Sequence, residues 1–336
     1  MIEFRPGGID VDEWRALTDD VPGSSLLQTW EYGDAKARTS AWRAERGRIV
    51  DGDRTIGVAQ ALVRPLPFGL GGLVWVNRGP LAVSGGDTRE RFDDLAGALH
   101  RHYAAERGLC LRIAPPLADG AVDTARIGAL GFSPTATLGW ASSRLDLNRP
   151  LDDVRAALNR KWRGHLNRAE RSPLTLRLGD GGAEFSAFLK AHEATVTGKG
   201  FDTSVTCDFL RALQDLLPAE RKMTVINAYD GDAHAGSVLL TYYGATAEYL
   251  AGNTSHEGRK LGAGQLMLWR ALELCQERGI AALDLSGQDP VKTPPGILTF
   301  KEGLNAEPYR LMNDLSARGS GLLNRLVEWR VNRALG

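Results

Sequence analysis

Apolar and polar positions along the chain predict strands and helices in a definite order. Two runs rich in apolar and β-branched residues, 42–50 and 55–66, are joined by Asp51-Gly52-Asp53. Two such runs around an Asp-Gly turn predict a β-hairpin. The pattern then predicts a strand at 69–81, a helix over 87–107 that Gly108 ends, and a strand at 109–117.

The same order of elements returns in the second half of the chain. Residues 224–244 form a second predicted hairpin around Asp230-Gly231-Asp232, 179 residues after the first turn. Glu277-Arg278-Gly279 ends a helix and opens a strand as Glu106-Arg107-Gly108 does 171 residues earlier. Such turns and glycine caps are individually common, but two at similar offsets indicate a duplicated unit. We therefore predict an α/β (α+β) fold of two copies, each a mixed β-sheet flanked by helices.

A glycine-containing segment in the second copy is the first candidate for chemistry. After a predicted strand, Arg259, Gly262 and Gly264 follow in R-x-x-G-x-G spacing before a helix predicted over 265–278. Glycines let the backbone approach an anion, and the start of a helix favours negative charge, so this segment can wrap a phosphate. The alternative is an ordinary strand-to-helix connection, because many glycine loops bind nothing. The equivalent stretch of the first copy, 77–87, lacks the spacing.

Positive charge gathers in the segment between the two copies. The pattern predicts one helix over 151–172, in which six positive charges face one acid between Arg155 and Arg171. Such a run is usually a solvated face, but clustered arginines also suit phosphate or RNA. The last predicted helix, 322–335, has an apolar stripe with arginines around it. Its basic surface is another candidate for contact with RNA.

Composition narrows the classes of function. The 336 residues, 43% hydrophobic and 24% charged, suit a globular protein of about two domains. Lysine plus arginine equals aspartate plus glutamate at 41 each, so no global field attracts nucleic acid: DNA is not an expected partner, and any contact with RNA must come from local clusters. No stretch approaches the roughly 20 apolar residues of a membrane span, and the first residues lack a signal-peptide core, so we expect a cytoplasmic protein. The three cysteines are expected as free thiols, and the histidine spacing predicts no metal site.

Residues 222–301, around the glycine segment, resemble the donor-binding core of the GNAT acyltransferases, whose R/Q-x-x-G-x-G/A loop grips the pyrophosphate of acyl-CoA. A longer series of short motifs runs through the chain: Gln28 with Trp30 and Lys36, Arg78-Gly79-Pro80, Lys161 with Arg163, and Phe300-Lys301 with Gly303. This series resembles the Fem family of aminoacyl-tRNA-dependent aminoacyltransferases, which are tandem GNAT-like proteins. The length of the chain is closest to that of the FemX type.

This resemblance implies two domains, residues 1–147 with 311–336 and residues 148–310, of which the second holds the donor. It implies transfer of an amino acid from aminoacyl-tRNA to an amine of a peptidoglycan precursor or of a small natural product, which forms an amide bond. The partners would be a charged tRNA and a small amine acceptor, with a monomeric protein and no tightly bound cofactor. Two alternatives stay open: an N-acyltransferase that uses acyl-CoA, and a non-catalytic binding protein that keeps the fold.

The resemblance also implies roles for individual residues. Lys301 would support the reacting carbonyl. Apart from the resemblance, the positions of Asp284 and Asp289, which flank Ser286-Gly287, suggest that either could take the proton of the amine, while for Asp284 a strand-end carboxylate bonded to backbone is the alternative. Ala114 stands before proline where peptidoglycan members tend to have an acid, which leaves the general base and the acceptor open. The remaining candidates are Tyr249, Gly252, Asn253, Arg259, Lys260, Gly262 and Gly264 for the donor, Lys36, Trp30, Arg78 and Lys199 for the acceptor and its phosphates, and Arg160, Lys161, Arg163 and Arg168 for RNA.

Overall fold

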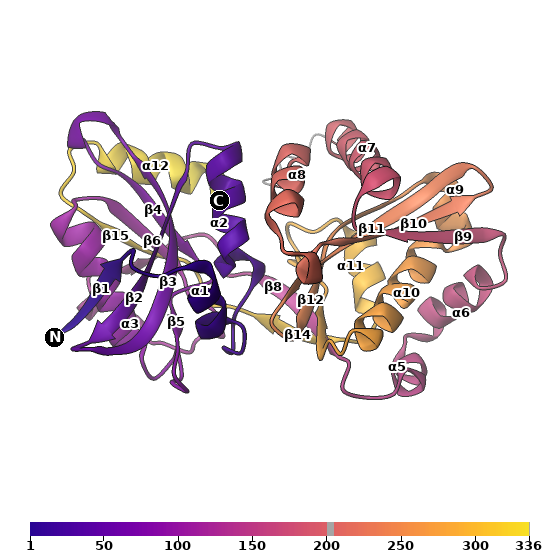
Figure 1. The fold of residues 1–336 in the computed structure, drawn as a ribbon, viewed down its shortest axis with the longest axis horizontal. Helices are drawn as coiled ribbons and strands as arrows, with labels where there is room; N and C mark the ends of the chain where they lie inside the picture. The colour runs from indigo at the N-terminus through magenta and orange to yellow at the C-terminus, as the bar shows by residue number, and fades with distance from the viewer. Residues whose placement is uncertain (200–204, 336) are drawn as a thin grey trace. The chain divides into compact units, whose positions relative to one another are not determined.

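The computed structural model describes residues 1–199 and 205–335, which form two compact units (Figure 1). Unit 1 consists of Met1–Trp140 with Arg310–Gly336, and unit 2 consists of Ala141–Tyr309. Each unit contains one mixed β-sheet with helices around it. The predicted fold class is therefore confirmed.

The sheet of unit 1 has the strand order β1-β2-β3-β4-β6-β15-β7, with β5 beside β3. Helix α3 places Phe92, Leu95, Ala96 and Leu99 in the core, which is the spacing of one helix face. The strands are β1 (Ile2–Pro6), β2 (Arg43–Asp51), β3 (Arg54–Pro65), β4 (Gly72–Asn77), β5 (Leu81–Ala82), β6 (Cys110–Ala114), β7 (Ser133–Pro134) and β15 (Leu315–Arg318). The helices are α1 (Val11–Thr18), η1 (Leu26–Gln28), α2 (Trp30–Thr39), η2 (Pro67–Gly69), α3 (Phe92–Leu99), η3 (His100–Glu106), α4 (Thr124–Ala129) and α12 (Asn324–Leu335).

The sheet of unit 2 has the order β9-β10-β11-β12-β13-β8-β14 and is covered on both faces. Along β10, Ile226 and Ala228 join the core beneath α10, while Asn227 points the other way and donates to the Glu184 carbonyl of α7. The strands are β8 (Ala141–Asp146), β9 (Leu174–Gly179), β10 (Thr224–Asp230), β11 (Ala233–Tyr243), β12 (Thr246–Thr254), β13 (Ala282–Asp284) and β14 (Glu307–Arg310). The helices are α5 (Leu151–Ala157), α6 (Arg160–Ala169), α7 (Gly182–Lys199), α8 (Cys207–Leu216), η4 (Ala219–Arg221), α9 (His256–Leu261), α10 (Ala263–Glu277) and α11 (Pro295–Glu302).

The two sheets repeat one topology. Both have an antiparallel hairpin in the same position, and in both the next strand is followed by a parallel neighbour, β4 with β6 and β12 with β13. Each hairpin also carries one extra residue in its second strand, Ile56 in β3 and Ala235 in β11. A bulge at the same offset from the turn in both hairpins confirms the predicted duplication.

In each sheet, the strand in the sixth position lies at one end of its unit's sequence: β15 is the last strand of unit 1, and β8 is the first strand of unit 2. β8 directly follows unit 1 along the chain but pairs with β13 of unit 2, where Leu145 lies opposite Leu283. β15 directly follows unit 2 but pairs with β6 of unit 1, where Leu315 lies opposite Ile113. Residues 141–147, which we expected at the end of the first domain, therefore begin unit 2, and Arg310 falls in unit 1.

Two predicted elements differ in detail. The helix expected over 151–172 is divided into α5 and α6, because Leu158 has an extended ψ of 143° and Asn159 then caps α6 by accepting a hydrogen bond from the Lys161 N–H at 2.9 Å. The expected loop before α10 contains the short helix α9, which ends at Gly262.

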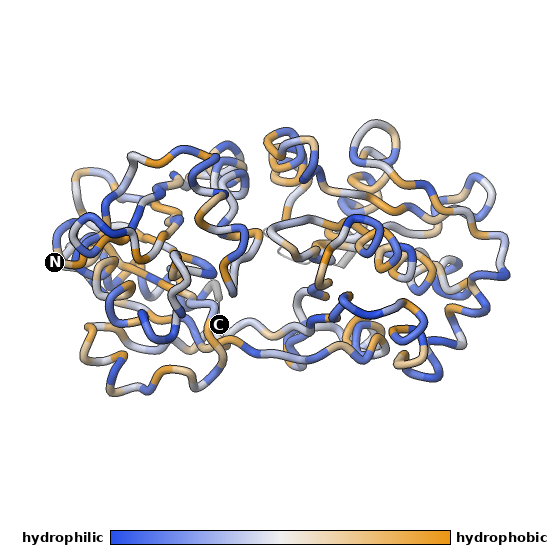
Figure 2. Tube along the Cα trace, turned by 60° about the horizontal axis from the view of Figure 1, so that its bottom comes forward, coloured by the Kyte–Doolittle hydropathy of each residue, from blue (hydrophilic) through white to orange (hydrophobic). Residues whose placement is uncertain are grey.

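Hydrophobic and hydrophilic residues interleave along the chain in both units (Figure 2). Over residues 1–199 and 205–335, no helix combines the length and the apolar composition that crossing a membrane requires.

Candidate active site in unit 2

The strands β12 and β13 separate at the centre of the unit 2 sheet. Their parallel pairing covers only Thr246–Glu248 and Ala282–Asp284, whereas β12 continues to Thr254. At the end of the paired part, Leu250 is an extra residue opposite β11, because Tyr249 faces Leu240 and Ala251 faces Leu239. A bulge bends a strand and redirects its backbone groups. Here the bulge lies just after the last residue of β12 that pairs with β13, so the backbone of β12 beyond it is redirected where the two strands part.

In the described part of unit 1 the corresponding strands do not separate in this way. There β4 and β6 stay in register to the last residue of β4, where Asn77 pairs with Ala114. The separated strands and the glycine segment thus occur in the same unit, unit 2, where we look for a donor site.

A cluster of buried polar side chains lies where β13 ends. The Asp284 carboxylate, 3% exposed, accepts hydrogen bonds from Ser142 Oγ (2.6 Å), Tyr309 OH (2.6 Å) and the Ser286 N–H (2.8 Å). Ser286 in turn donates its hydroxyl to Glu248 Oε1 at 2.5 Å. Two of the three bonds to Asp284 come from side chains and one from the backbone, and together they fix the turn after β13.

Lys301 lies beside this cluster. Its side chain, on α11, is 6% exposed and donates to the carbonyls of Ser286 (3.3 Å) and Gly287 (3.1 Å). The ammonium also lies 5.3 Å from the centre of the Tyr249 ring. Burial lowers the pKa of Lys301 to about 8, against the opposing pull of Asp284 and Glu248. Lys301 therefore carries a positive charge at neutral pH and loses it within the mildly alkaline range.

Helix α6 fixes the position of Lys301. Trp162 Nε1 donates to the Phe300 carbonyl at 3.0 Å, and the two rings lie 6.1 Å apart. Gly303 follows α11 with no side chain, and a Cβ at that position would overlap the Trp162 ring. Trp162 was not among the residues predicted from the sequence, although it stands between Lys161 and Arg163 in one of the motifs above.

Tyr249 and Gly252 lie together on the bulged part of β12. The Tyr249 hydroxyl occupies the space that a Cβ of Gly252 would fill, so glycine is required there. Burial raises the pKa of Tyr249 to about 12, which keeps its hydroxyl protonated. The Asn253 amide nitrogen is shielded from solvent and has no hydrogen-bond partner within the described ranges. Three predicted donor residues thus line the strand that faces Lys301.

The glycine segment has a packing role in this structure. Gly262 has a φ of +81°, and a Cβ there would lie 2.9 Å from the Ala169 Cβ of α6. Gly264 faces the Phe300 ring, at 3.3 Å from its would-be Cβ. Arg259 donates to the Thr254 carbonyl at 2.8 Å, and Lys260 pairs with Glu257. Any phosphate contact here would rest on the backbone N–H groups at the start of α10.

Two basic residues of α6 contact other groups of the chain, and two others are exposed. Arg163 is half-buried and donates to the Ala156 carbonyl at 3.0 Å, and Arg168 contacts His165 at 2.7 Å. Arg160 and Lys161 are exposed.

Asp289, the second carboxylate predicted as a base, accepts from the backbone N–H groups of residues 291 and 292 and so shapes its own loop.

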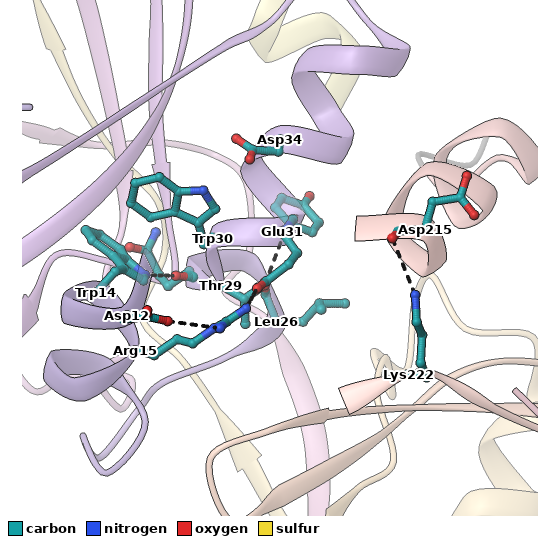
Figure 3. A network of polar contacts seen from close by, with 12 residues as sticks. Asp12, Trp14, Arg15, Leu26, Thr29, Trp30, Glu31, Asp34, Asp215 and Lys222 are labelled. Carbon is teal, nitrogen blue, oxygen red and sulfur yellow. Dashed lines mark hydrogen bonds and ion pairs between the residues drawn. The ribbon is translucent and has the colours of Figure 1, made fainter. Parts of the chain in front are cut away.

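The candidate acceptor residues that the structure describes lie in unit 1, and Lys199, whose side chain lies outside the described part, cannot be placed with them. Trp30 supports the fold, because the Arg46 guanidinium stacks 4.0 Å from its ring centre and donates to its carbonyl. Glu31, the residue after Trp30, forms an ion pair with Arg15, and this contact fixes the start of α2 (Figure 3). Burial lowers the pKa of Lys36 on the same helix to about 8.

Arg78 follows β4 in a left-handed conformation, with φ of 57°, and its guanidinium lies 5.0 Å from the Trp140 ring centre. Gln28, just before α2, donates to the carbonyl of Asn77 at 2.7 Å. This bond joins the start of the Lys36 helix to the strand end that carries Arg78, so the first two motifs of the series lie together.

Among the residues described, no group of three His, Cys, Asp or Glu side chains is placed to bind a metal ion.

Comparisons with known proteins bear on this architecture. Residues 152–301 match the family model of the acetyltransferase (GNAT) domain. The crystal structure of FemX matches 96% of this chain and 100% of its own with a TM-score of 0.80 at 17% sequence identity. The chain has the fold of FemX. No curated protein sequence matches it.

Two further solved structures share this fold at lower similarity. A tandem GNAT protein from the clavulanic acid biosynthesis pathway matches 95% of this chain and 98% of its own, with a TM-score of 0.54 at 17% identity. L-PGS from Bacillus licheniformis matches 97% of each chain, with a TM-score of 0.56 at 13% identity. The predicted resemblance to Fem proteins is thereby confirmed for the fold, with a GNAT domain over residues 152–301.

Proposed function

We propose that the protein is an aminoacyltransferase that moves an amino acid from aminoacyl-tRNA to an amine and so forms an amide bond. The observation that carries the proposal is the buried ammonium of Lys301, held where β12 and β13 separate. Such a charge is costly to bury and is expected where negative charge develops in a reaction. The FemX-like fold supports the choice of an aminoacyl donor over other acyl donors.

The proposed reaction needs no covalent enzyme intermediate. The neutral amine of the acceptor attacks the ester carbonyl, the new C–N bond forms, and the C–O bond to the tRNA ribose breaks. The proton that the amine loses passes to the departing ribose oxygen, directly or through water. Lys301 and the backbone N–H groups of bulged β12 stabilise the oxyanion, and the closed cluster around Asp284 holds Lys301 in place.

The two substrates would use different parts of the chain. Arg160 and Lys161 are exposed beside the donor site and would contact the tRNA backbone. Lys36 and Arg78 of unit 1 would hold phosphates of the acceptor, which we expect to be a peptidoglycan precursor or a small natural product. Charged tRNA is a cytoplasmic substrate, and the proposed reaction therefore takes place in the cytoplasm, without a tightly bound cofactor.

One observation favours a second candidate. The match of residues 152–301 to the acetyltransferase (GNAT) domain suits an enzyme that takes its acyl group from acyl-CoA. In that reaction the amine attacks a thioester and CoA leaves as the thiol, while Lys301 keeps the same role. The start of α10 would then contact the CoA pyrophosphate.

A donor competition experiment tests the proposal. Purified protein is incubated with a pool of radiolabelled aminoacyl-tRNAs, with and without excess CoA and acetyl-CoA, and filter retention and loss of label from tRNA are measured. Saturable retention of one aminoacyl-tRNA that CoA does not displace is the expected result. Saturable binding of acetyl-CoA together with no retention of any charged tRNA would overturn the proposal in favour of the second candidate.

A further inference from the structure

An exposed apolar surface with basic residues lies at one end of unit 1. It comprises the tip of the β3–β4 hairpin and one side of α12. Its apolar members are Phe68 (97% exposed), Leu322 (83%), Trp329 (56%) and Leu326 (49%), and we call it the α12 patch. Scattered exposed apolar residues are ordinary, but four large ones on adjoining segments are typical of a binding surface.

The two segments of the α12 patch are fastened to each other. The Leu323 N–H donates to the Leu70 carbonyl at 2.9 Å, and the buried Asn324 side chain accepts from the Gly72 N–H at 3.2 Å. Asn324 also donates to the Gly108 carbonyl at 2.7 Å. The hairpin tip and the start of α12 therefore form one continuous surface, which α12 extends beside β4 (Figure 1).

Phe68 occupies a conformation that its side chain does not favour. It has a φ of 57° at the tip of the hairpin, where glycine or asparagine would be less strained. Its ring gains nothing from burial within the chain, since it is almost fully exposed. The Phe68 ring therefore adds no buried contact to the folded chain, and a contact with a binding partner would explain its presence at this position.

The charges of the α12 patch have one sign. Arg325, Arg330 and Arg333 are exposed on α12, and in the part of the chain that the structure describes none of the three makes an ion pair. Glu328 is the sole acid between residues 319 and 336, and it is bonded to Arg318 at 2.8 Å. The surface thus combines exposed Trp, Phe and Leu side chains with unneutralised arginines.

We infer that the α12 patch docks the protein on an anionic lipid surface, independently of the proposed reaction. Apolar side chains enter the boundary between headgroups and acyl chains, and arginines pair with anionic headgroups, which is how amphipathic helices bind membranes. RNA would use the arginines but offers little to Leu322 and Leu326, since aliphatic side chains cannot stack on bases as aromatic ones do. A two-fold contact between copies would bring the arginines of each copy against those of the other.

Vesicle co-sedimentation of the full chain tests the inference. Phosphatidylcholine vesicles with phosphatidylglycerol should bind the protein, and phosphatidylcholine alone should bind it far more weakly. Arg325→Gln with Arg330→Gln should lower the partition coefficient about 25-fold, which is roughly fivefold for each arginine. Phe68→Asn with Leu322→Gln and Leu326→Gln should leave only a weak binding that high salt abolishes, because the electrostatic part alone remains.

Matched controls separate the patch from general surface chemistry. Val291→Gln changes an apolar residue that is 84% exposed in unit 2, and Arg43→Gln with Arg54→Gln removes two exposed arginines elsewhere in unit 1. Both controls should bind vesicles as the parent protein does, and Phe68→Asn alone should not lower the thermal midpoint. Absence of binding to anionic vesicles, or equal binding by all variants, would overturn the inference. So would a dimer that the apolar variant converts to monomer, or loss of tRNA binding in the arginine variant with vesicle binding unchanged.

Discussion

Lys301 is held by neutral backbone groups while two carboxylates lie nearby. Its hydrogen bonds go to the carbonyls of Ser286 and Gly287. Asp284 and Glu248 act on the ammonium through their charge and raise its pKa against the effect of burial. The ammonium is thus positioned by neutral acceptors, which suits a group that meets a developing oxyanion.

The first prediction concerns this charge. Lys301→Met should lower kcat by about 10²–10³, the usual scale for losing one oxyanion stabiliser, with little change in KM. Because the pKa of Lys301 lies near 8, the rate of the parent enzyme should fall as pH rises through that value and the ammonium loses its proton. The residual rate of Lys301→Met should lack this fall. Initial rates of transfer between neutral and alkaline pH measure both effects.

Lys292→Met serves as the control, because Lys292 is an exposed lysine nine positions earlier in the chain. It should leave both the rate and its pH profile unchanged. A Lys301→Met enzyme that keeps the parent rate would remove Lys301 from the mechanism.

At the residue scale, a short motif can single out one side chain but not its surroundings. Phe300-Lys301 pointed to a lysine that the structure shows to be buried, but the partners of Lys301 come from a different segment, and only the fold brings the Ser286 carbonyl to it. Trp162 was missed for a related reason. A tryptophan in a basic segment suggests RNA or solvent as readily as a hydrogen bond to a carbonyl 138 positions away.

At the scale of elements, α6 and α11 act as one support. The Asn159 N–H donates to the Gly303 carbonyl at 3.0 Å, and Trp162 packs against the same turn. The break between α5 and α6 makes this contact possible, because Asn159 leaves the helical path and its N–H becomes free to bond outside the helix. A continuous helix over 151–172, as the charge pattern suggested, would have closed that bond internally.

The second prediction tests this support. Gly303→Ala should slow transfer and lower the free energy of unfolding by about 1–3 kcal/mol, because the added methyl group must displace the Trp162 ring. Gly296→Ala, within α11 itself, is the matched control, since nothing lies within 4 Å of a Cβ there. Urea denaturation and single-turnover rates compare the two. Equal behaviour of the two variants would show that the α6–α11 contact does not matter.

The third prediction concerns the glycine between α9 and α10. Gly262 needs both its left-handed φ and the space beside Ala169, whereas Gly279 has a φ of +68° with no atom within 4 Å of a Cβ. Gly279→Ala should therefore cost only the backbone strain, about 1 kcal/mol, and Gly262→Ala should cost visibly more. Thermal unfolding of both variants measures the difference. If the Gly262→Ala protein is as stable as Gly279→Ala but binds the donor more weakly, then Gly262 serves donor phosphate binding and not packing against α6.

For the whole molecule, the duplication could be predicted from the sequence because both copies keep the same turn residues. The two Asp-Gly-Asp turns lie 179 residues apart, and the bulges at Ile56 and Ala235 keep that offset. The pairing of the sixth strands was not visible in those turns. A short strand such as Leu315–Arg318 has the same pattern whichever sheet receives it, so its place in the first domain was expected from the family resemblance alone, and its partner β6 is known only from the structure.

The exchanged strand of unit 1 is fastened by a buried ion pair. Arg112 of β6 is 2% exposed and bonds Asp314, just before β15, at 2.7 Å, while its guanidinium also reaches Thr137 at 2.6 Å. Removing one partner of such a pair leaves a buried charge without compensation, which costs about 3–5 kcal/mol. Unit 1 should therefore depend on this contact more than on the pairing of β15 alone.

The fourth prediction follows from this dependence. Asp314→Ala should destabilise unit 1 by about 3–5 kcal/mol, because Arg112 keeps its charge and loses its carboxylate. Limited proteolysis with mass spectrometry should then find cuts within residues 1–140 while residues 141–309 stay protected, since unit 2 keeps its own sheet and its own exchanged strand β8. Glu328→Gln removes a partly exposed pair with Arg318 in the same returning segment and should change stability by less than about 1 kcal/mol. If Asp314→Ala is cut no faster than Glu328→Gln, or is cut equally in both units, the buried pair is not what closes unit 1.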